Sequence, residues 1–266
     1  MFEDKIVLLR GGGDIATGIA YVLYNAGFKI IITEISKPSA IRRTVAFCDA
    51  IYNSKQVVEN ITCEKVNNVN EANGILSDGN IPILVDEKLD LLKEIKPDIL
   101  IDSILAKKNL GTNIDMADLV IGVGPGFTAK IDCHYVIETM RGHNLARVIR
   151  DGQAQPNTGV PGLIANHGKD RVIHAENDGI IRNVKSISDN VKTGDIIAYI
   201  DDNPVKATID GILRGIIIDG YEVTKGLKIA DIDPRESEKN NCFTISDKAR
   251  AIGGGVLMAI LHHYNM

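Results

Sequence analysis

A glycine-rich turn near the start of the chain has the spacing of a phosphate-binding loop. An apolar run, Lys5 to Leu9, precedes it and is typical of a buried parallel strand, and the segment from Asp14 to Ala26 has apolar residues at helical spacing. Glycine in such a turn lets backbone N–H groups approach a pyrophosphate, and the amino end of the helix adds positive charge. Gly11, Gly13 and Ala16 are the first, third and sixth residues of a G-x-G-x-x-A pattern. The residues predicted to contact a nucleotide here are Gly11, Gly12, Gly13, Asp14, Ala16, Thr17 and Gly18.

An acidic residue ends the next apolar run. Glu34 lies 23 residues beyond Gly11, near the usual place of the acid that accepts hydrogen bonds from a ribose 2′-OH. Asp14, in the first turn of the predicted helix, suits the helix dipole but repels an incoming phosphate. The alternative for this whole pattern is a tight strand–helix turn that holds no ligand.

A second glycine-rich loop follows a later apolar run, and Gly124 and Gly126 are its candidate ligand contacts. Ligands of parallel sheets bind beyond the carboxyl ends of the strands, so the two glycine-rich loops are expected to share one site. Arg42, Arg43 and Lys107 are the predicted partners of the ligand's phosphate groups. A plain turn is the alternative interpretation of the second loop.

Reactive side chains are dense between residues 132 and 144. Cys133 is the candidate nucleophile, with His134 or His143 as its base. Neighbouring residues on a regular element face apart, so these groups could meet only through the tertiary fold. The alternative is one buried cysteine and two surface histidines. A Cys/His pair can also form a soft-metal site, but no metal ligands are assigned here.

Strand and helix patterns alternate through the first half of the chain. Further strands are predicted at 82–85, 98–102 and 119–123, a hairpin at 57–66, and a helix that begins at Pro38 and carries Arg42 and Arg43 in its first turns. We therefore predict an α/β fold for residues 1–155, a Rossmann-like nucleotide-binding domain with a parallel sheet and helices on both faces.

A 32-residue repeat follows a boundary rich in turn-forming residues. Asp178 to Arg182 matches Asp210 to Arg214, and Val191 to Gly194 matches Val223 to Gly226. The pattern resembles lipoyl and biotinyl domains, so a small all-β barrel-sandwich domain is predicted for residues 156–235. A swinging cofactor arm is not expected, because the hairpin between the repeats has no lysine at its tip.

The last part of the chain, residues 236–266, is predicted to be a helical segment that packs back on the first domain. Ser246 is a suitable helix cap. Gly253, Gly254 and Gly255 lie in the middle of this helix at a cost of about 1 kcal/mol each relative to alanine. They indicate either close packing or a break beside a ligand.

Composition limits the partners. The 266 residues carry a formal net charge of −5, which argues against nucleic acid as the main partner. The late apolar stretch at 251–261 is too short to span a bilayer, and no signal peptide is predicted at the acidic amino terminus. Scattered cysteines favour a reducing, cytoplasmic location. The repeat region and the last helix could each form the interface of a homo-oligomer.

Taken together, the motifs resemble the YqeB family, the accessory proteins of selenium-dependent molybdenum hydroxylases. The match runs nearly end to end and rests on the segments 10–18, 42–47, 106–109, 124–127, 132–134, 141–143, 157–159, 231–235 and 243–248. The resemblance implies a role in the maturation of a molybdenum hydroxylase, in the steps that make its cofactor selenium-dependent. The implied partners are the apo-hydroxylase and its other maturation factors.

Two hypotheses follow from this resemblance. A cofactor-handling factor would hold NAD(P), another nucleotide or the nucleotide form of the molybdopterin cofactor across both glycine-rich loops, with Cys133 carrying sulfur or selenium. That chemistry needs a low thiol pKa, which Asp14, Asp102 and Asp132 oppose and Arg141 favours. A non-catalytic chaperone would use the fold as a scaffold and dock the apo-hydroxylase. An NAD(P)-dependent oxidoreductase is a third alternative, although the sequence shows no recognisable proton-relay set.

Overall fold

The computed structural model describes residues 2, 4–159, 164–165 and 167–265. The chain forms two compact units. The first consists of Met1–Pro38, Ala46–Asn157 and Ile245–Met266, and the second of Ser39–Val45 and Thr158–Thr244. Each unit contains its own sheets and its own hydrophobic core, so each is described by itself.

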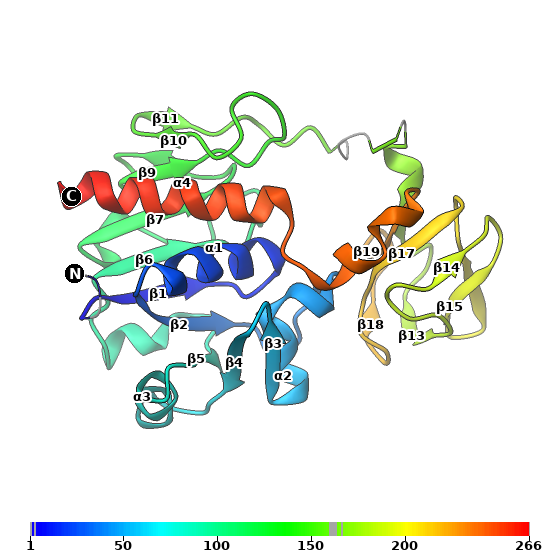
Figure 1. Ribbon diagram of the computed structural model, residues 1–266, viewed down its shortest axis with the longest axis horizontal. Coiled ribbons are helices and arrows are strands. Elements are labelled where there is room, and N and C mark those ends of the chain that lie inside the picture. The colour runs from blue at the N-terminus through cyan, green and yellow to red at the C-terminus, as the bar shows by residue number, and fades with distance from the viewer. Residues whose placement is uncertain (1, 3, 160–163, 166, 266) are drawn as a thin grey trace. The chain divides into compact units, whose positions relative to one another are not determined.

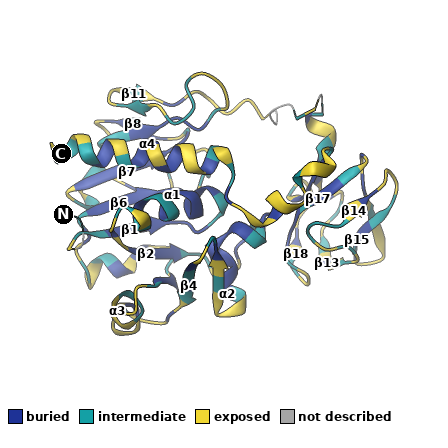
Figure 2. Cartoon of the chain, in the orientation of Figure 1, coloured by how far each residue is buried: buried dark blue, intermediate teal, exposed yellow. Residues whose placement is uncertain are grey.

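The first unit is built on a nine-stranded sheet with the order β10-β9-β7-β6-β1-β2-β5-β4-β3 (Figure 1). Neighbours from β9 to β4 pair in parallel, and the two edge strands, β10 and β3, pair antiparallel. The central strands are dark blue in Figure 2 because they are buried, as strands covered on both faces must be. The strands of this sheet are β1 (Ile6–Arg10), β2 (Lys29–Glu34), β3 (Lys55–Val58), β4 (Ile61–Lys65), β5 (Ile81–Val85), β6 (Ile99–Asp102), β7 (Leu119–Val123), β9 (Tyr135–Ile137) and β10 (Val148–Ile149).

Few regular helices accompany this sheet. They are α1 (Asp14–Asn25), α2 (Ala50–Asn53), α3 (Val69–Ser77) and α4 (Asp247–His263), and a small second sheet pairs β8 (Thr128–Ala129) with β11 (Gly152–Gln153). Two of the connections contain only a 3-10 turn, at Asp90–Lys93 and at Ile114–Met116. The hairpin predicted at 57–66 is confirmed by the antiparallel pairing of β3 with β4.

The helix predicted to begin at Pro38 is wrong. The segment instead holds 3-10 turns at Arg43–Val45 and Phe47–Asp49, followed by the short α2. The reason is tertiary, because residues 39–45 belong to the second unit. There the carbonyl of Ile41 accepts a hydrogen bond from the Ile216 N–H at 2.9 Å. In a helix the same carbonyl would point along the helix axis toward an N–H of the next turn.

Helices α1 and α4 lie side by side in the first unit and make its closest helix contact (Figure 1). A Cβ added at Gly18 would lie 2.5 Å from the Cβ of Ala249, and one added at Gly253 would lie 2.7 Å from the Gly18 carbonyl oxygen. Glycine at both positions is therefore what lets the two backbones approach. Close packing was one of the two explanations predicted for the glycines in the last helix, and at Gly253 this explanation is correct. The same contact between helices explains why residue 18 is glycine.

The second unit follows the 32-residue repeat strand for strand. Strands β12 to β15 belong to the first repeat and β16 to β19 to the second, and each sheet combines two strands of each, in the orders β12-β19-β17-β14 and β16-β15-β13-β18. Asp210 accepts from the Thr193 N–H at 2.8 Å, and the equivalent Asp178 accepts from the Lys225 N–H at 2.7 Å. The strands are β12 (Val172–His174), β13 (Gly179–Asn183), β14 (Asn190–Val191), β15 (Ile196–Ile200), β16 (Asn203–Lys206), β17 (Gly211–Ile216), β18 (Glu222–Val223) and β19 (Lys228–Asp233).

Two 3-10 turns, Glu236–Glu238 and Asn240–Phe243, follow β19, and a third, Lys169–Arg171, precedes β12. The core of this unit consists of the inward-facing apolar side chains of both sheets, among them Ile181, Leu213 and Ile232.

The predicted fold class is wrong. The large sheet is mixed rather than purely parallel, because the hairpins at both ends add antiparallel strands, and 3-10 turns replace some of the expected covering helices. The described part of the second unit forms two four-stranded antiparallel sheets and gives no evidence of a small biotinyl-like barrel domain. Strand pairing is a long-range property, so the local patterns that locate strands do not determine it.

Candidate functional site

The glycine turn after β1 packs closely against other segments at two of its three residues. Gly11 has φ +94°, and its N–H donates to the Thr33 carbonyl at 2.8 Å. The Gly12 carbonyl accepts from the Cys48 N–H at 2.8 Å. Gly13 differs, because a Cβ added there would meet no atom within 4 Å. The turn is therefore closed at its start and open at the beginning of the helix.

The open residue is also the N-cap of α1. Gly13 has extended backbone angles, and no side chain caps the helix through a hydrogen bond. The first N–H groups of a helix carry partial positive charge and have no partner within the helix. The hydroxyl of Thr17 donates to the Gly13 carbonyl at 2.9 Å and accepts from the Phe47 N–H at 2.9 Å, so this side chain fixes the turn. The geometry leaves space for an anion beside Gly13.

Glu34 lies where the sequence places it, beside the turn, but its carboxylate is already engaged. It accepts from the Gly12 N–H at 2.8 Å and from the Ile35 N–H at 2.8 Å. Burial raises the pKa of Glu34, and these two hydrogen bonds oppose the increase. A carboxylate has further lone pairs, so a ribose hydroxyl could share Glu34 with the two amides. A phosphate could not take the Gly12 N–H without displacing Glu34.

The loop after β6 lies against both glycine-rich loops. A Cβ at Gly11 would be 3.2 Å from the Ile104 backbone, and one at Gly126 would be 2.7 Å from the Lys108 backbone. Gly124, with φ +83°, is similarly close to Thr139 and Leu105. The close packing of these loops at the carboxyl ends of the strands explains why glycine occupies these positions. Lys107 belongs to the same intervening loop and is exposed.

A buried ion pair that the sequence analysis missed anchors this intervening loop. Arg10 Nη1 lies 3.2 Å from Asp102 Oδ2, and both side chains are almost fully buried. The Thr112 hydroxyl donates to the same oxygen at 2.7 Å, and Arg10 Nη2 donates to the Leu110 carbonyl at 3.2 Å. Removing one member of such a pair typically costs about 3–5 kcal/mol. The conformation of this loop therefore depends on Arg10.

Arg42 and Arg43 are not in the same unit as the glycine turn. Both belong to the second unit, where Arg42 Nη2 donates to the carbonyls of Asn241 and Thr244 at 3.2 and 3.3 Å. Arg43 Nε donates to the Ile216 carbonyl at 3.1 Å. The structure thus assigns both arginines backbone contacts within the second unit.

The three predicted catalytic residues have three different surroundings. Cys133 is fully buried among the apolar side chains beneath the sheet, and burial raises its thiol pKa to about 12. His134 Nδ1 accepts from the Val120 N–H at 3.0 Å, and its ring packs edge-on against His263. His143 is exposed in the loop before β10. Cys133 is therefore not poised as a thiolate, because the apolar surroundings oppose its ionisation.

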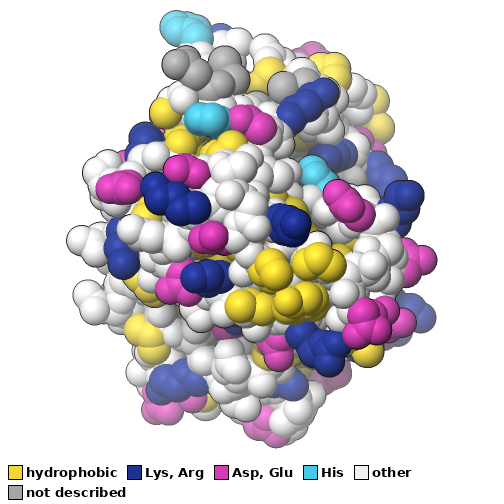
Figure 3. Space-filling model, turned by 90° about the vertical axis from the view of Figure 1, so that its right-hand side faces the viewer, with side chains coloured by type: hydrophobic (Ala, Val, Ile, Leu, Met, Phe, Trp, Pro, Cys, Tyr) yellow, Lys and Arg dark blue, Asp and Glu magenta, His cyan; other side chains and the backbone are white. Residues whose placement is uncertain are grey.

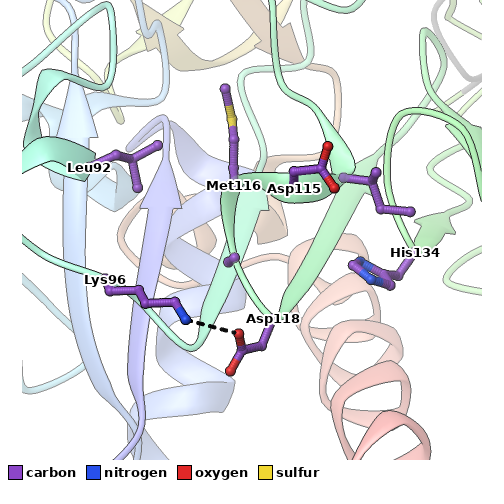
Figure 4. Close-up of a pocket in the computed structure, with 8 residues that line it drawn as sticks. Leu92, Lys96, Asp115, Met116, Asp118 and His134 are labelled. Carbon is purple, nitrogen blue, oxygen red and sulfur yellow. Dashed lines mark ion pairs between the residues drawn. The ribbon is translucent and has the colours of Figure 1, made fainter.

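His134 lines a cavity at the amino edge of the sheet, the edge opposite the glycine turn (Figure 4). The cavity has a volume of about 660 Å³ and also contains an ion pair between Lys96 and Asp118, with 3.7 Å between Nζ and Oδ1. Burial lowers the pKa of His134, and the neighbouring His263 lowers it further. His134 is thus separated from the glycine turn by the length of the strands.

Two residues near the turn were missed. Cys48 is buried against Gly12, and burial together with the nearby charge of Glu34 raises its thiol pKa. Lys248, in the first turn of α4, is half-buried and lies within electrostatic range of Asp14. No local signal marks either residue, because both reach the turn through contacts that are distant in sequence.

The surface charges and the arrangement of possible metal ligands give no further site among the described residues. Figure 3 shows basic and acidic side chains interspersed over one face, around a group of hydrophobic side chains. Among the described residues, no three His, Cys, Asp or Glu side chains are arranged to hold a metal ion. In the same part of the chain, none of the helices combines the length and the apolar content needed to cross a bilayer.

Comparison with solved structures gives only distant similarity. The ectoine utilization protein EutE (DoeB) from Ruegeria pomeroyi is 10% identical, over 86% of this chain and 85% of that chain, with a TM-score of 0.27. A succinylglutamate desuccinylase from Silicibacter sp. TM1040 is 13% identical, over 87% and 85% of the two chains, also with a TM-score of 0.27. TM-scores this low do not establish a common fold, so no activity is transferred from these enzymes.

Comparison with known sequences gives a close relative. No protein-family model matches the chain. The uncharacterized protein YqeB of Escherichia coli (strain K12) is 50% identical over 257 residues, which cover 97% of this chain and 47% of that protein. The chain thus spans about half the length of the curated relative it matches. Over nearly its whole length this chain is therefore similar to part of the YqeB protein.

Proposed function

We propose that this protein is an accessory factor in the maturation of a selenium-dependent molybdenum hydroxylase, and that it binds a nucleotide or a nucleotide-containing molybdenum cofactor beside Gly13. The pathway comes from the family resemblance of the motifs. The ligand comes from the site, and one observation carries it: an uncapped helix amino end opens onto free space at Gly13, next to the acid Glu34. Phosphate groups bind at such helix ends through N–H groups and the helix dipole.

The test is ligand-induced stabilisation of the purified protein. Native mass spectrometry of freshly purified protein identifies any ligand retained, and thermal-shift assays then compare NAD, NADP, CTP and ATP. A ligand that binds only the folded state raises the melting temperature. At 100 times the dissociation constant the stabilisation is about 2.7 kcal/mol.

Gly13→Val is the decisive variant, because the structure predicts that it folds. The backbone at Gly13 has φ −66°, which valine can adopt, and an added Cβ meets no atom of another segment within 4 Å. Its methyl groups would occupy the space proposed for the phosphate. The variant should melt near the wild-type temperature and lose the ligand-induced shift. A retained shift would show that the ligand binds elsewhere.

The chaperone alternative is favoured by one observation, the burial of all four cysteines. With a thiol pKa of about 12, Cys133 is a poor carrier of sulfur or selenium in this conformation. If the protein acts by docking the apo-hydroxylase, Cys133→Ser should leave maturation of the hydroxylase intact in cells. Loss of maturation by a folded Cys133→Ser variant would instead support a covalent role.

A further inference from the structure

The cavity at the amino ends of the parallel strands has no part in the site at Gly13. Its volume of about 660 Å³ is within the range of about 300–1,000 Å³ that small-molecule sites have. The segments that lead into β6, β7 and β9 line it, and they meet at one edge because these strands are parallel. The lining combines an apolar wall with polar side chains, among them Leu92, Met116, Lys96, Asp115, Asp118 and His134 (Figure 4).

A backbone hydrogen bond fixes the tautomer of His134. Its Nδ1 accepts from the Val120 N–H at 3.0 Å, so the proton of the neutral ring is on Nε2. Nε2 has no hydrogen-bond partner among the residues that the structure describes, and the ring faces the cavity (Figure 4). His134 therefore offers a neutral N–H donor to an oxygen atom of a ligand. It is not arranged to bind a metal ion, because a metal ion would need the lone pair of Nε2.

Two carboxylates face the same cavity, and they differ in their partners. Asp118 Oδ1 lies 3.7 Å from Lys96 Nζ, and both of these side chains are exposed. The carboxylate of Asp115 forms no ion pair and no hydrogen bond with any residue in the described part of the chain. One lysine against two aspartates leaves the lining with one negative charge that no protein cation balances. The cavity therefore favours a ligand with one positive charge.

We propose that this cavity binds a protonated amine that stands next to a carbonyl group and an apolar substituent, the chemistry of amino-acid amides and of peptide amino termini. Asp115 accepts hydrogen bonds from the ammonium group, and the Nε2–H of His134 donates to the carbonyl oxygen. Leu92 and Met116 contact the apolar substituent. Charge-assisted hydrogen bonds such as that of Asp115 are the strong ones. The inference is independent of the proposed function, because this cavity and Gly13 lie at opposite edges of the sheet.

Titration of the full chain with small amides, followed by NMR of the backbone amides of residues 114–120, tests the chemistry of the ligand. Leucinamide should shift these signals until they saturate. N-acetyl-leucinamide, which lacks the positive charge, should bind about 10-fold more weakly, and glycinamide, which lacks the isobutyl group, should also bind more weakly. Tighter binding of leucylglycylglycine than of leucinamide would identify a peptide amino terminus as the ligand, whereas equal binding would identify the small amide.

Two variants test the contacts with leucinamide. Asp115→Asn should weaken binding by about 3- to 10-fold, the range of an ordinary net hydrogen bond. His134→Asn should weaken it by a similar factor, because the shorter asparagine side chain still accepts from the Val120 N–H but does not extend into the cavity as Nε2 does. Asp202→Asn removes an exposed acid of the second unit and is the matched control, which should bind as the wild type does.

Three results would overturn the inference. The first is wild-type affinity of folded Asp115→Asn, and the second is equal affinity of the wild type for the free and the acetylated amine. The third is a leucinamide titration that leaves the signals of residues 114–120 unchanged. None of these results bears on nucleotide binding at Gly13, which Gly13→Val tests separately.

Discussion

Three consecutive glycines in α4 should respond in opposite directions to a single added methyl group. A Cβ at Gly254 meets nothing within 4 Å, whereas one at Gly253 would lie 2.7 Å from the Gly18 carbonyl oxygen. A Cβ at Gly255 would lie 2.3 Å from the Ala146 carbonyl oxygen. All three residues are in the interior of one helix, so alanine brings the same gain in helix propensity at each, about 1 kcal/mol. Differences among the variants therefore measure contacts of α4 with its neighbours.

Gly254→Ala should raise the free energy of unfolding by about 1 kcal/mol, or the melting temperature by about 2–4 °C. At Gly253 an overpacking cost of about 2–3 kcal/mol offsets this gain, because a backbone carbonyl and the β-branched Val22 cannot turn away. The net loss for Gly253→Ala is about 1–2 kcal/mol. Gly255→Ala should lose more, since its contact is the shorter one.

The assay is urea unfolding of the three variants and the wild type, followed by far-ultraviolet circular dichroism. Gly74→Ala in α3 is a second positive control, because a Cβ there also meets nothing within 4 Å. If Gly253→Ala were stabilised as much as Gly254→Ala, the close packing of α1 on α4 would be wrong.

Three further predictions concern titration and thiol reactivity. Burial raises the pKa of Glu34 above its ordinary value of 4.5, so the folded state holds the carboxyl proton more tightly than the unfolded state does. The wild type should therefore lose stability relative to Glu34→Gln as the pH rises from 4.5 through the folded pKa, and identical pH profiles in urea unfolding would refute this. The pKa of His134 is lowered below 6.5 in the folded state, so its contribution to folding stability is present above pH 6.5 and is lost as the pH falls through the folded pKa. The melting temperature of His134→Gln should therefore drop less below pH 6.5 than that of the wild type does. All four cysteines are buried, so the native protein should react slowly with Ellman's reagent and release four equivalents only after denaturation; a fast-reacting thiol in the native protein would contradict the burial.

Much of the local structure could be predicted from the sequence. The strand before Gly11, the helix after Gly13 and the hairpin of β3 and β4 are where the apolar patterns put them. The 32-residue repeat also reappears as matching strands in the second unit. These features depend on residues close together in the chain, where glycine, helix caps and apolar spacing act directly.

The site was predicted less well, because it depends on contacts between distant segments. Sequence spacing places Glu34 beside the turn, but not its hydrogen bond to the Gly12 N–H. Cys133 was the candidate nucleophile with His134 or His143 as its base, which required the fold to bring them together. Instead, Cys133 is buried in the core, and His134 lines a cavity at the amino edge of the sheet. Lys248 has no local signal at all.

The sequence by itself determined the strand before Gly11, the helix after Gly13, the hairpin of β3 and β4, and which segments repeat, since these follow from neighbouring residues. Only the tertiary structure decided that the sheet is mixed, that Gly18 and Gly253 serve helix packing, and that Gly13 alone in its turn faces open space. The physical reason is that strand pairing and close packing are settled by the summed contacts of residues far apart in the chain. No window of sequence contains those contacts.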